Sequence, residues 1–153
     1  MNNANYSPSF FRFEDLRVYQ KALDYYIWVQ INTEMFPNAS ESHLVKDFVR
    51  TAQNIPGQIA EGSSKSKTQF IFHLKEAKTA IRQCVMFTST AEKQNYFGEE
   101  QEETSRNYLM ELTKMLGALI GSIQREHSPT TSHNLEHKND AGDGEEEDNH
   151  NSY

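Results

Sequence analysis

Four segments of the chain carry apolar residues at the three- and four-residue spacing of amphipathic helices. This spacing predicts helices over about residues 14–36, 41–61, 67–95 and 99–125. The third segment is the most regular, because its apolar positions alternate four and three apart as in a heptad seam: Phe70, Leu74, Ala77, Ile81, Cys84, Thr88 and Ala91. No segment shows the alternation typical of a strand. The sequence therefore predicts an all-α fold, an antiparallel up-down four-helix bundle.

The first segment has an apolar stripe of five residues widened by Ala22 and Tyr26, and we expect this stripe to be buried: Leu16, Tyr19, Leu23, Ile27 and Ile31. Its helix is expected to start near Glu14–Asp15, whose charges suit a helix N-terminus. Trp28 falls on the more polar face of this helix, between Asp24 and Asn32. Either it belongs to a broad buried stripe, or it contacts another subunit.

The second segment places five apolar residues on one helical face: Leu44, Phe48, Ala52, Ile55 and Ile59. Pro56 lacks a backbone donor and predicts a bend at Ile55. Gly62 is expected just past the helix end, in the left-handed conformation that glycine adopts without steric cost. A short polar and basic turn follows, from Ser63 to Lys67.

The two ends of the chain differ from the predicted bundle over residues 14–125. Residues 1–13 form a polar N-terminal arm that ends in a small aromatic cluster. Residues 126–153 hold eight acidic residues against one basic residue. Residues 1–125 hold fourteen of each, so the formal charge of −7 lies wholly in the C-terminal segment. With so few apolar residues, this segment is predicted to be a disordered acidic tail.

The run Ile59–Gly62, Ile-Ala-Glu-Gly, is followed by serine and then Lys65. Further residues along the chain belong with this run in the comparison that follows: Phe13, Asp15-Leu16, Val18-Tyr19-Gln20, Ala22, Thr33, Phe36-Pro37, Leu44, Arg50, Ala52, Ile55-Pro56, Phe70, Leu74, Ala77, Met115-Leu116 and Leu119-Ile120. On these residues the chain resembles, from about Phe13 to Ile123, the bacterial four-helix-bundle proteins encoded in intervening sequences of the 23S ribosomal RNA gene. It departs from the family pattern where that pattern has two adjacent arginines (here Val49-Arg50), a serine (Asn54), an asparagine (Gln58), Gly-Ser-Leu (Thr79-Ala80-Ile81) and a glutamate (Gln83).

The resemblance implies a homo-oligomer, a ring of five bundles. It also implies kinship in fold with the accessory variability determinant of diversity-generating retroelements, which binds its reverse transcriptase and has a basic surface for nucleic acid. RNA, DNA or a reverse transcriptase-like enzyme is therefore the partner that the resemblance suggests. The resemblance implies no enzymatic activity.

Seven basic residues fall between Leu44 and Arg82, against three acidic residues, which gives this stretch a net charge of +4: Lys46, Arg50, Lys65, Lys67, Lys75, Lys78 and Arg82. These residues are the candidate nucleic-acid-binding set, gathered around the corner between the second and third helices. The alternative is that they are solvated helix faces with local ion pairs. Only Phe70 and Phe72 are interleaved with them, so base-specific contacts are not predicted.

Arg50 and Glu61 stand eleven residues apart, three helical turns, and so lie on similar faces of the second helix. With Trp28 they are the candidate oligomer interface, in which a polar pair would fix subunit orientation. Because a glutamate near a helix C-terminus is electrostatically disfavoured, we expect Glu61 to have a specific partner. The alternative to this structural role is a catalytic role for Glu61.

Several other chemistries lack the residues that they need. The single cysteine, Cys84, excludes an intramolecular disulfide and is expected to be a small buried side chain. A metal site in a bundle needs Glu-x-x-His pairs on facing helices, and the four predicted helices have none, so no metal and no cofactor are predicted. The Arg-x4–6-His spacing of HEPN-class ribonucleases is also missing. The Lys67-Thr68 pair lacks the second glycine and the preceding strand of a phosphate loop.

The longest apolar run, Tyr25–Val29, is far short of the roughly 20 residues that span a bilayer, and no signal peptide precedes it. We therefore expect a cytoplasmic protein. The sequence favours a non-enzymatic oligomeric scaffold that binds nucleic acid, or a nucleic-acid enzyme, through its basic corner. The alternative is a protein–protein adaptor with no nucleic-acid role, in which the acidic tail shields that corner.

Overall fold

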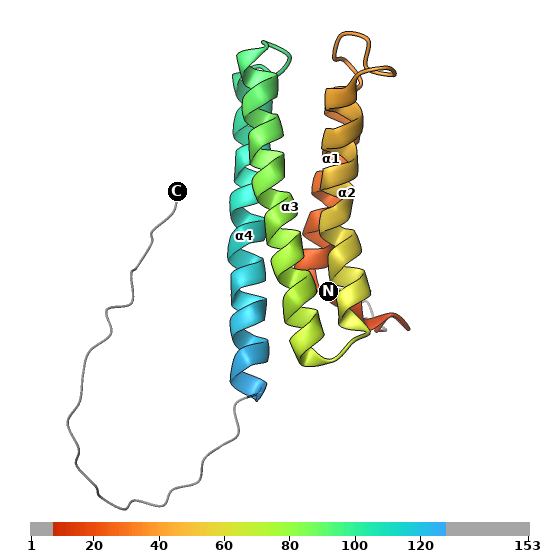
Figure 1. Ribbon diagram of the computed structural model, residues 1–153, viewed down its shortest axis with the longest axis vertical. Helices are drawn as coiled ribbons and strands as arrows, with labels where there is room; N and C mark the ends of the chain where they lie inside the picture. Colours follow the sequence, from red (N-terminus) through yellow and green to blue (C-terminus); the bar gives the residue numbers. More distant parts are fainter. Residues whose placement is uncertain (1–7, 128–153) are drawn as a thin grey trace, which may run out of the picture.

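The computed structural model describes residues 8–127 as a four-helix bundle preceded by a short 3-10 helix. The elements are η1 (Arg12–Asp15), α1 (Arg17–Thr33), α2 (His43–Ser63), α3 (Lys67–Lys93) and α4 (Glu99–His127). Each helix packs against its two neighbours around the bundle, α1 closing the ring against α4. Figure 1 shows the α1–α2 and α3–α4 connections at one end, and the α2–α3 turn with the end of α4 at the other. The predicted all-α up-down bundle is confirmed.

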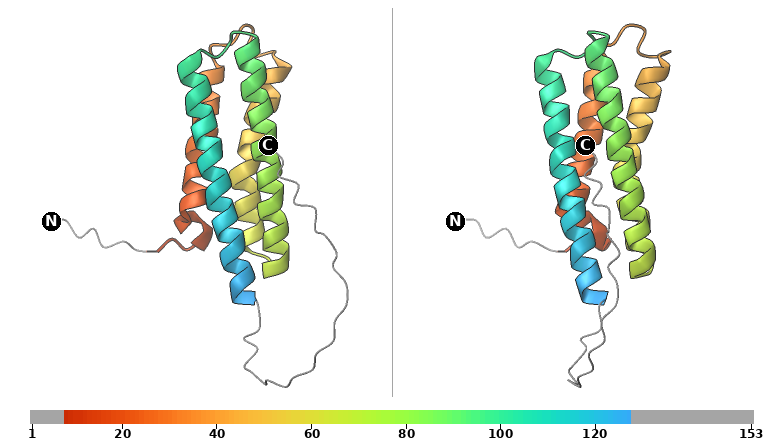
Figure 2. Two further views of the ribbon diagram at one scale, coloured as in Figure 1. Left: turned by 90° about the vertical axis from the view of Figure 1, so that its left-hand side faces the viewer. Right: turned by 60° about the vertical axis from the view of Figure 1, so that its left-hand side comes forward.

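The core runs along the axis of the bundle. Figure 2 shows the arrangement of the four helices from two further sides. The predicted face of α2 is confirmed, since Phe48, Ala52, Ile55 and Ile59 are buried and Leu44 is half-buried. The predicted seam of α3 is likewise buried, except that Phe70 is half-buried. In α4 the buried apolar residues are Leu109, Leu112, Leu116, Ile120 and Ile123.

The buried stripe predicted for α1 is wrong in its register. The buried residues are Val18, Ala22, Tyr25, Val29 and Thr33, while Ile27 and Ile31 are 49% and 59% exposed. The aromatic side of the helix has turned inward, because the Tyr25 and Trp28 rings pack against Tyr108 of α4. The two isoleucines are therefore left on the outer face.

The start of α1 also differs from the prediction. Residues 12–15 form η1, and Leu16 breaks the helix with extended backbone (ψ 125°) before α1 begins at Arg17. The break lets the Phe13 ring fold onto Tyr19, with ring centroids 5.0 Å apart in an edge-to-face arrangement. Packing of this aromatic side chain outweighs continuation of the helix.

The ends of α1 and α3 meet through aromatic side chains. Helix α1 stops at Thr33 rather than residue 36, and the buried Phe36 packs edge-to-face on Phe97, 5.2 Å between centroids. The chain turns at Asn38 and Asn95, whose φ angles are positive at 50° and 59°. Asparagine tolerates this left-handed region better than most residues, so it suits both turns.

The end of α2 contradicts the role predicted for Gly62. No glycine in the described part of the chain has positive φ, and the helix continues through Pro56 and Gly62 to Ser63. The Ser63 and Ser64 hydroxyls donate to the Ala60 and Glu61 carbonyls, so the last turn is satisfied without a left-handed residue. Gly62 serves packing instead: a Cβ atom there would lie 2.5 Å from the His73 Cβ of α3.

Most of the two predicted end segments lies outside the described residues. Of the predicted tail, only Glu126 and His127 are described, and both belong to α4. Of the predicted arm, residues 8–13 are described, with Phe10 and Phe11 exposed. No helix within residues 8–127 is long and apolar enough to cross a membrane.

Candidate functional site

The seven predicted basic residues do not gather at one corner. Lys46 and Arg50, one turn apart, lie on α2, and Lys65 and Lys67 flank the α2–α3 turn. The remaining three share one stripe of α3: Lys75, Lys78 and Arg82. We call these three residues the α3 basic stripe. Helical spacing separates the groups, because residues that are close in sequence project from different sides of the two helices.

The α3 basic stripe lies on the side of the helix that faces α4. Its three- and four-residue spacing continues to Val85 and Ser89, and Ser89 Oγ accepts a hydrogen bond from Arg106 of α4 at 3.0 Å. The side of α3 that faces α2 carries His73 and Phe87 instead, which contact Gln58 and Phe48. Arg50 and the stripe therefore belong to different surfaces.

Local acids neutralise some of the seven residues. Arg50 pairs with Asp47 at 3.8 Å, Lys65 with Glu61 at 3.4 Å, and Lys67 with Glu126 at 3.5 Å. These pairs are solvent-exposed, so each is worth at most about 1 kcal/mol. Lys75 and Lys78 make no ion pair with any residue of 8–127. Lys46 likewise makes no ion pair there, so the lysines of the set that lack one are Lys46 on α2 and Lys75 and Lys78 within the stripe.

The helices beside the stripe are also poor in acids. Residues 67–91 and 112–125, which make up most of α3 and the second half of α4, hold six basic residues and one acidic residue, Glu76. The acids of α4 collect in its first turns, at Glu99, Glu100, Glu102 and Glu103. There they suit the positive end of the helix. The α3–α4 side is therefore acidic at the end where α4 begins and basic along the rest of its length.

Arg50 and Glu61 do not form the pair that was considered for subunit orientation. Their eleven-residue separation in one helix corresponds to about 16 Å along its axis, and each pairs locally, with Asp47 and Lys65. The expectation that Glu61 has a specific partner is confirmed by Lys65. Contact of either residue with another subunit stays a prediction.

Trp28 is half-buried and packs within its own chain. Its ring stacks with Tyr25, 6.1 Å between centroids, and lies 5.6 Å from Phe97 and 6.3 Å from Tyr108. These contacts account for a tryptophan at this position as part of the α1–α4 seam. A role at a subunit interface stays a prediction, because part of the side chain is still open to solvent.

A polar groove between α2 and α3 was not predicted as a unit. It has a volume of about 500 Å³ and is lined by Arg50, Thr51, Gln53, Asn54, Gly57 and Gln83. We call it the α2–α3 groove. Gly57 lies on the exposed face of α2, and nothing lies within 4 Å of a Cβ added there. The sequence signal available for this groove is a glycine inside a helix, seven residues after Arg50 and so on the same face, and the prediction of the site did not use it.

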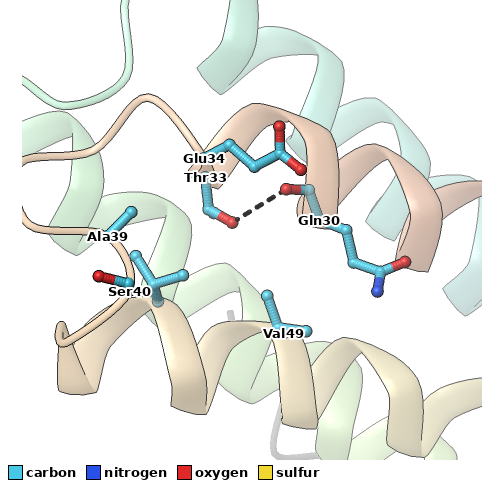
Figure 3. A pocket seen from close by; sticks show the side chains of 7 residues that line it. Gln30, Thr33, Glu34, Ala39, Ser40 and Val49 are labelled. Carbon is cyan, nitrogen blue, oxygen red and sulfur yellow. Dashed lines mark hydrogen bonds between the residues drawn. The ribbon is translucent and has the colours of Figure 1, made fainter.

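A second hollow lies where α1 ends and α2 begins (Figure 3). It has a volume of about 440 Å³ and is lined by Gln30, Thr33, Glu34, Ala39, Ser40, Val45 and Val49. The Thr33 hydroxyl points to the Gln30 carbonyl, 3.5 Å away, and also donates to the Val29 carbonyl at 2.8 Å. Valine walls with a polar rim suit an apolar side chain of another protein better than a reacting group.

The core contains a chain of hydroxyl groups that ends on a backbone carbonyl. Thr88 Oγ1 donates to the Cys84 carbonyl at 2.8 Å, so it must accept from Ser105 Oγ, 2.7 Å away. Ser105 in turn accepts from the Tyr25 hydroxyl at 2.9 Å. Burial raises the pKa of the Tyr25 hydroxyl above its usual range and raises the pKa of the Cys84 thiol to about 12. Both groups are protonated at neutral pH, and the thiol is not a nucleophile there.

Among residues 8–127, no group of three or more His, Cys, Asp or Glu side chains is placed to hold a metal ion. The buried His73 bonds through Nδ1 to Gln58 Oε1 at 2.7 Å. This contact joins α2 to α3 beside Gly62.

The structure thus defines a helical-bundle protein whose surface features are a basic stripe, a polar groove and an apolar hollow. The model of the 23S rRNA-intervening sequence protein family matches residues 14–118, and the chain belongs to this family. A solved structure from Bacteroides thetaiotaomicron, a protein of unknown function from the S23 ribosomal protein family, is similar in fold. Its TM-score is 0.62 at 22% identity, over 67% of this chain and 97% of that chain. No functionally curated protein matches the sequence.

Proposed function

We propose that this protein is a non-enzymatic helical-bundle scaffold that binds the phosphates of RNA or DNA through the α3 basic stripe. The observation that carries the proposal is the segregation of charge. Lys75 and Lys78 lack an ion pair with any described residue, and the neighbouring half of α4 contributes no acid between Glu111 and Glu126. Such a stripe attracts polyanions and releases their counterions on binding.

The stripe is suited to backbone contacts more than to base recognition. Lysine is a flexible point charge that meets phosphate from many directions. Phe72 precedes Lys75 by three residues, on the adjoining face of α3, and its ring is 59% exposed. One exposed ring beside a basic stripe favours stacking of an unpaired base, so single-stranded RNA or DNA is the preferred ligand class.

A matched pair of double variants tests this surface. Lys75→Gln/Arg82→Gln removes one lysine and one arginine from the stripe, and Lys46→Gln/Arg50→Gln removes the same charges from α2. Fluorescence anisotropy with a labelled single-stranded RNA would give the dissociation constant between 50 and 300 mM salt. We expect the stripe variant to weaken binding and to flatten the salt dependence, by about 0.7 in log–log slope for each lost phosphate contact.

The α2 variant is expected to retain most of the affinity, because its residues lie on another surface and Arg50 already pairs with Asp47. Equal losses in the two variants would show that net charge alone is responsible and would contradict the stripe. A third variant, Lys65→Glu/Lys67→Glu, reports on the turn, where both lysines already face acids. Unchanged binding in that variant would remove the turn from the site.

A protein–protein adaptor is the second candidate, and a specific observation favours it. Apolar side chains are exposed along the outer face of α1 and just beyond its end: Ile27, Ile31 and Met35, the last 89% exposed. Exposed aliphatic side chains beside the α1–α2 hollow mark a protein-binding surface. Self-association into the ring of five subunits that the family resemblance implies would cover such a face. Binding to a protein partner that persists at high salt would favour this candidate.

A further inference from the structure

The surface between α3 and α4 beside the basic stripe is open. A groove of about 280 Å³ between these helices is lined by Val85, Arg106, Asn107, Leu109, Met110 and Thr113. Farther along α4, nothing lies within 4 Å of a Cβ added at Gly117, and the residue is exposed. A chain lying along this side would therefore meet basic side chains on α3 and little obstruction on α4.

The chain carries its own segment of opposite charge. Residues 136–148, outside the described part of the chain, contain seven acidic residues and one basic residue: Glu136, Asp140, Asp143, Glu145, Glu146, Glu147 and Asp148 against Lys138. Four of the acids are consecutive, from Glu145 to Asp148. A run of this kind concentrates negative charge, the property by which a phosphate backbone is attracted to basic side chains.

The acidic segment is tethered next to the basic surface. Helix α4 ends at His127, at the same end of the bundle as the α2–α3 turn (Figure 1). There Lys67 Nζ lies 3.5 Å from Glu126 Oε2, which holds the end of α4 against the start of α3. Because α3 and α4 are antiparallel, a chain that turns back after His127 runs beside α3 toward Arg82.

The tether is long enough to cover the stripe. From Lys67 to Arg82 the helix rises by about 22 Å. Glu145 follows His127 by eighteen residues, and a flexible chain of that length has a root-mean-square reach of about 25 Å. A segment at this separation from His127 is therefore within reach of Lys75, Lys78 and Arg82, and a tether of this length corresponds to an effective concentration on the order of 1 mM.

From these observations we propose that residues 136–148 fold back onto the α3 basic stripe of their own chain and compete there with nucleic acid. The docking stands on charge complementarity, tether length and the position of the tether. Its consequence, an autoinhibited nucleic-acid site, rests on the proposed function. Ligand phosphates displace the segment at low salt, and loss of the acidic charge exposes the stripe.

Zero-length cross-linking of the full chain tests the docking itself. A carbodiimide joins carboxylates to lysine amines that are in contact, and mass spectrometry locates the joined residues. We expect cross-links from Glu145–Asp148 to Lys75 and Lys78, reduced several-fold in 500 mM salt, and few to Lys46. Mixing isotopically heavy and light chains separates contacts within one chain from contacts between chains. Cross-links spread evenly over all lysines, or found mainly between heavy and light chains, would overturn the fold-back.

Nucleic-acid affinity tests the competition. Glu145→Gln/Glu146→Gln/Glu147→Gln removes three negative charges from the segment, and Glu99→Gln/Glu100→Gln/Glu103→Gln removes the same charge from exposed positions at the other end of the bundle. We expect the first variant to bind single-stranded RNA roughly tenfold more tightly at 50 mM salt, and the second to change much less. Equal tightening would overturn the competition, since only net charge would then matter. If no variant binds nucleic acid, the competition and the proposed function both fail, while the cross-links still decide the docking.

Discussion

Two glycines of α2 show how the effect of one residue depends on what surrounds it. Gly57 faces open space, whereas a Cβ at Gly62 would lie 2.5 Å from His73 Cβ and 2.9 Å from Phe70 Cδ2. Both have ordinary helical backbone, since neither has positive φ. Gly62 is thus required by the close approach of α3, and Gly57 only weakens the helix.

We expect Gly57→Ala to raise the free energy of unfolding by about 0.5–1 kcal/mol. Gly62→Ala is expected to lower it by about 1–3 kcal/mol, because α2 and α3 must move apart. Chemical denaturation monitored by circular dichroism compares the two variants on the same helix. Equal effects of the two substitutions would mean that the α2–α3 contact is looser than the structure indicates.

Two buried groups with raised pKa values, Tyr25 and Cys84, make stability depend on alkaline pH. Their pKa values are raised in the folded protein because burial disfavours the charged forms. The unfolded chain therefore releases protons first, from about pH 9 upward, so stability is complete below pH 9 and declines above it. The slope is about 1.4 kcal/mol per pH unit for each group that ionises only on unfolding.

Denaturation midpoints measured from pH 7 to 11 should therefore fall above pH 9. Cys84→Ala removes one of the two ionising groups, so it should reduce the slope of the free energy of unfolding against pH by about 1.4 kcal/mol per pH unit. This change is expected whatever the effect of the substitution on stability at pH 7. The difference in slope is the readout, so a less stable variant remains informative. An unchanged slope would mean that the thiol is already ionised in the folded state at these pH values.

At the scale of elements, a chain of hydroxyls joins three helices. Tyr25 on α1, Ser105 on α4 and Thr88 on α3 form a directed series of hydrogen bonds inside an otherwise apolar core. Each hydroxyl donates once, so the series works only when the three helices keep one register. The inward turn of Tyr25 also explains why Ile27 and Ile31 lie outside.

Ser105→Ala should cost about 1–3 kcal/mol, because it leaves the buried Tyr25 hydroxyl without its acceptor. The hydrogen bond lost in Tyr25→Phe should lower the free energy of unfolding by less than the bonds lost in Ser105→Ala, because Ser105 keeps its hydrogen bond to Thr88. The double variant should be less destabilised than the sum of the two single variants. Thermal or urea unfolding of the four proteins measures this coupling, and strict additivity would contradict the series.

At the scale of the whole molecule, two kinds of surface lie apart on one bundle. The basic stripe is on the α3–α4 side, while exposed aliphatic residues lie on the outer face of α1. If the protein forms a ring of bundles, the apolar face is the better candidate for contacts between copies. The basic stripe of each copy would then add to the charge that the ring presents to one nucleic-acid strand.

Ile27→Glu/Ile31→Glu should lower the molar mass measured by light scattering toward that of one chain, 17.7 kDa. The helical circular dichroism should remain, since both side chains are about half exposed. Thr68→Glu/Gln69→Glu adds the same charge at exposed positions in the first turn of α3 and should leave the mass unchanged. A mass that is unaffected by the isoleucine substitutions would place the subunit contact on another face.

The periodic spacing of apolar residues determined the four helices and the buried faces of α2 and α3. Each of these helices has one clear apolar stripe, so local spacing is enough to orient it. The short connections then allow an up-down arrangement. Composition also separated the acidic end of the chain from the bundle.

Only the tertiary structure decided the orientation of α1 and the grouping of the basic residues. Helix α1 has apolar residues on more than one face, and the choice among them depends on Tyr108 and Phe97, which are 83 and 69 residues after the α1 side chains that they contact, Tyr25 and Trp28. Similarly, seven basic residues close in sequence fall on different surfaces, because their directions depend on how α2 and α3 pack. Spacing within a helix fixes which residues share a face, but the partner of that face is set by contacts between distant segments.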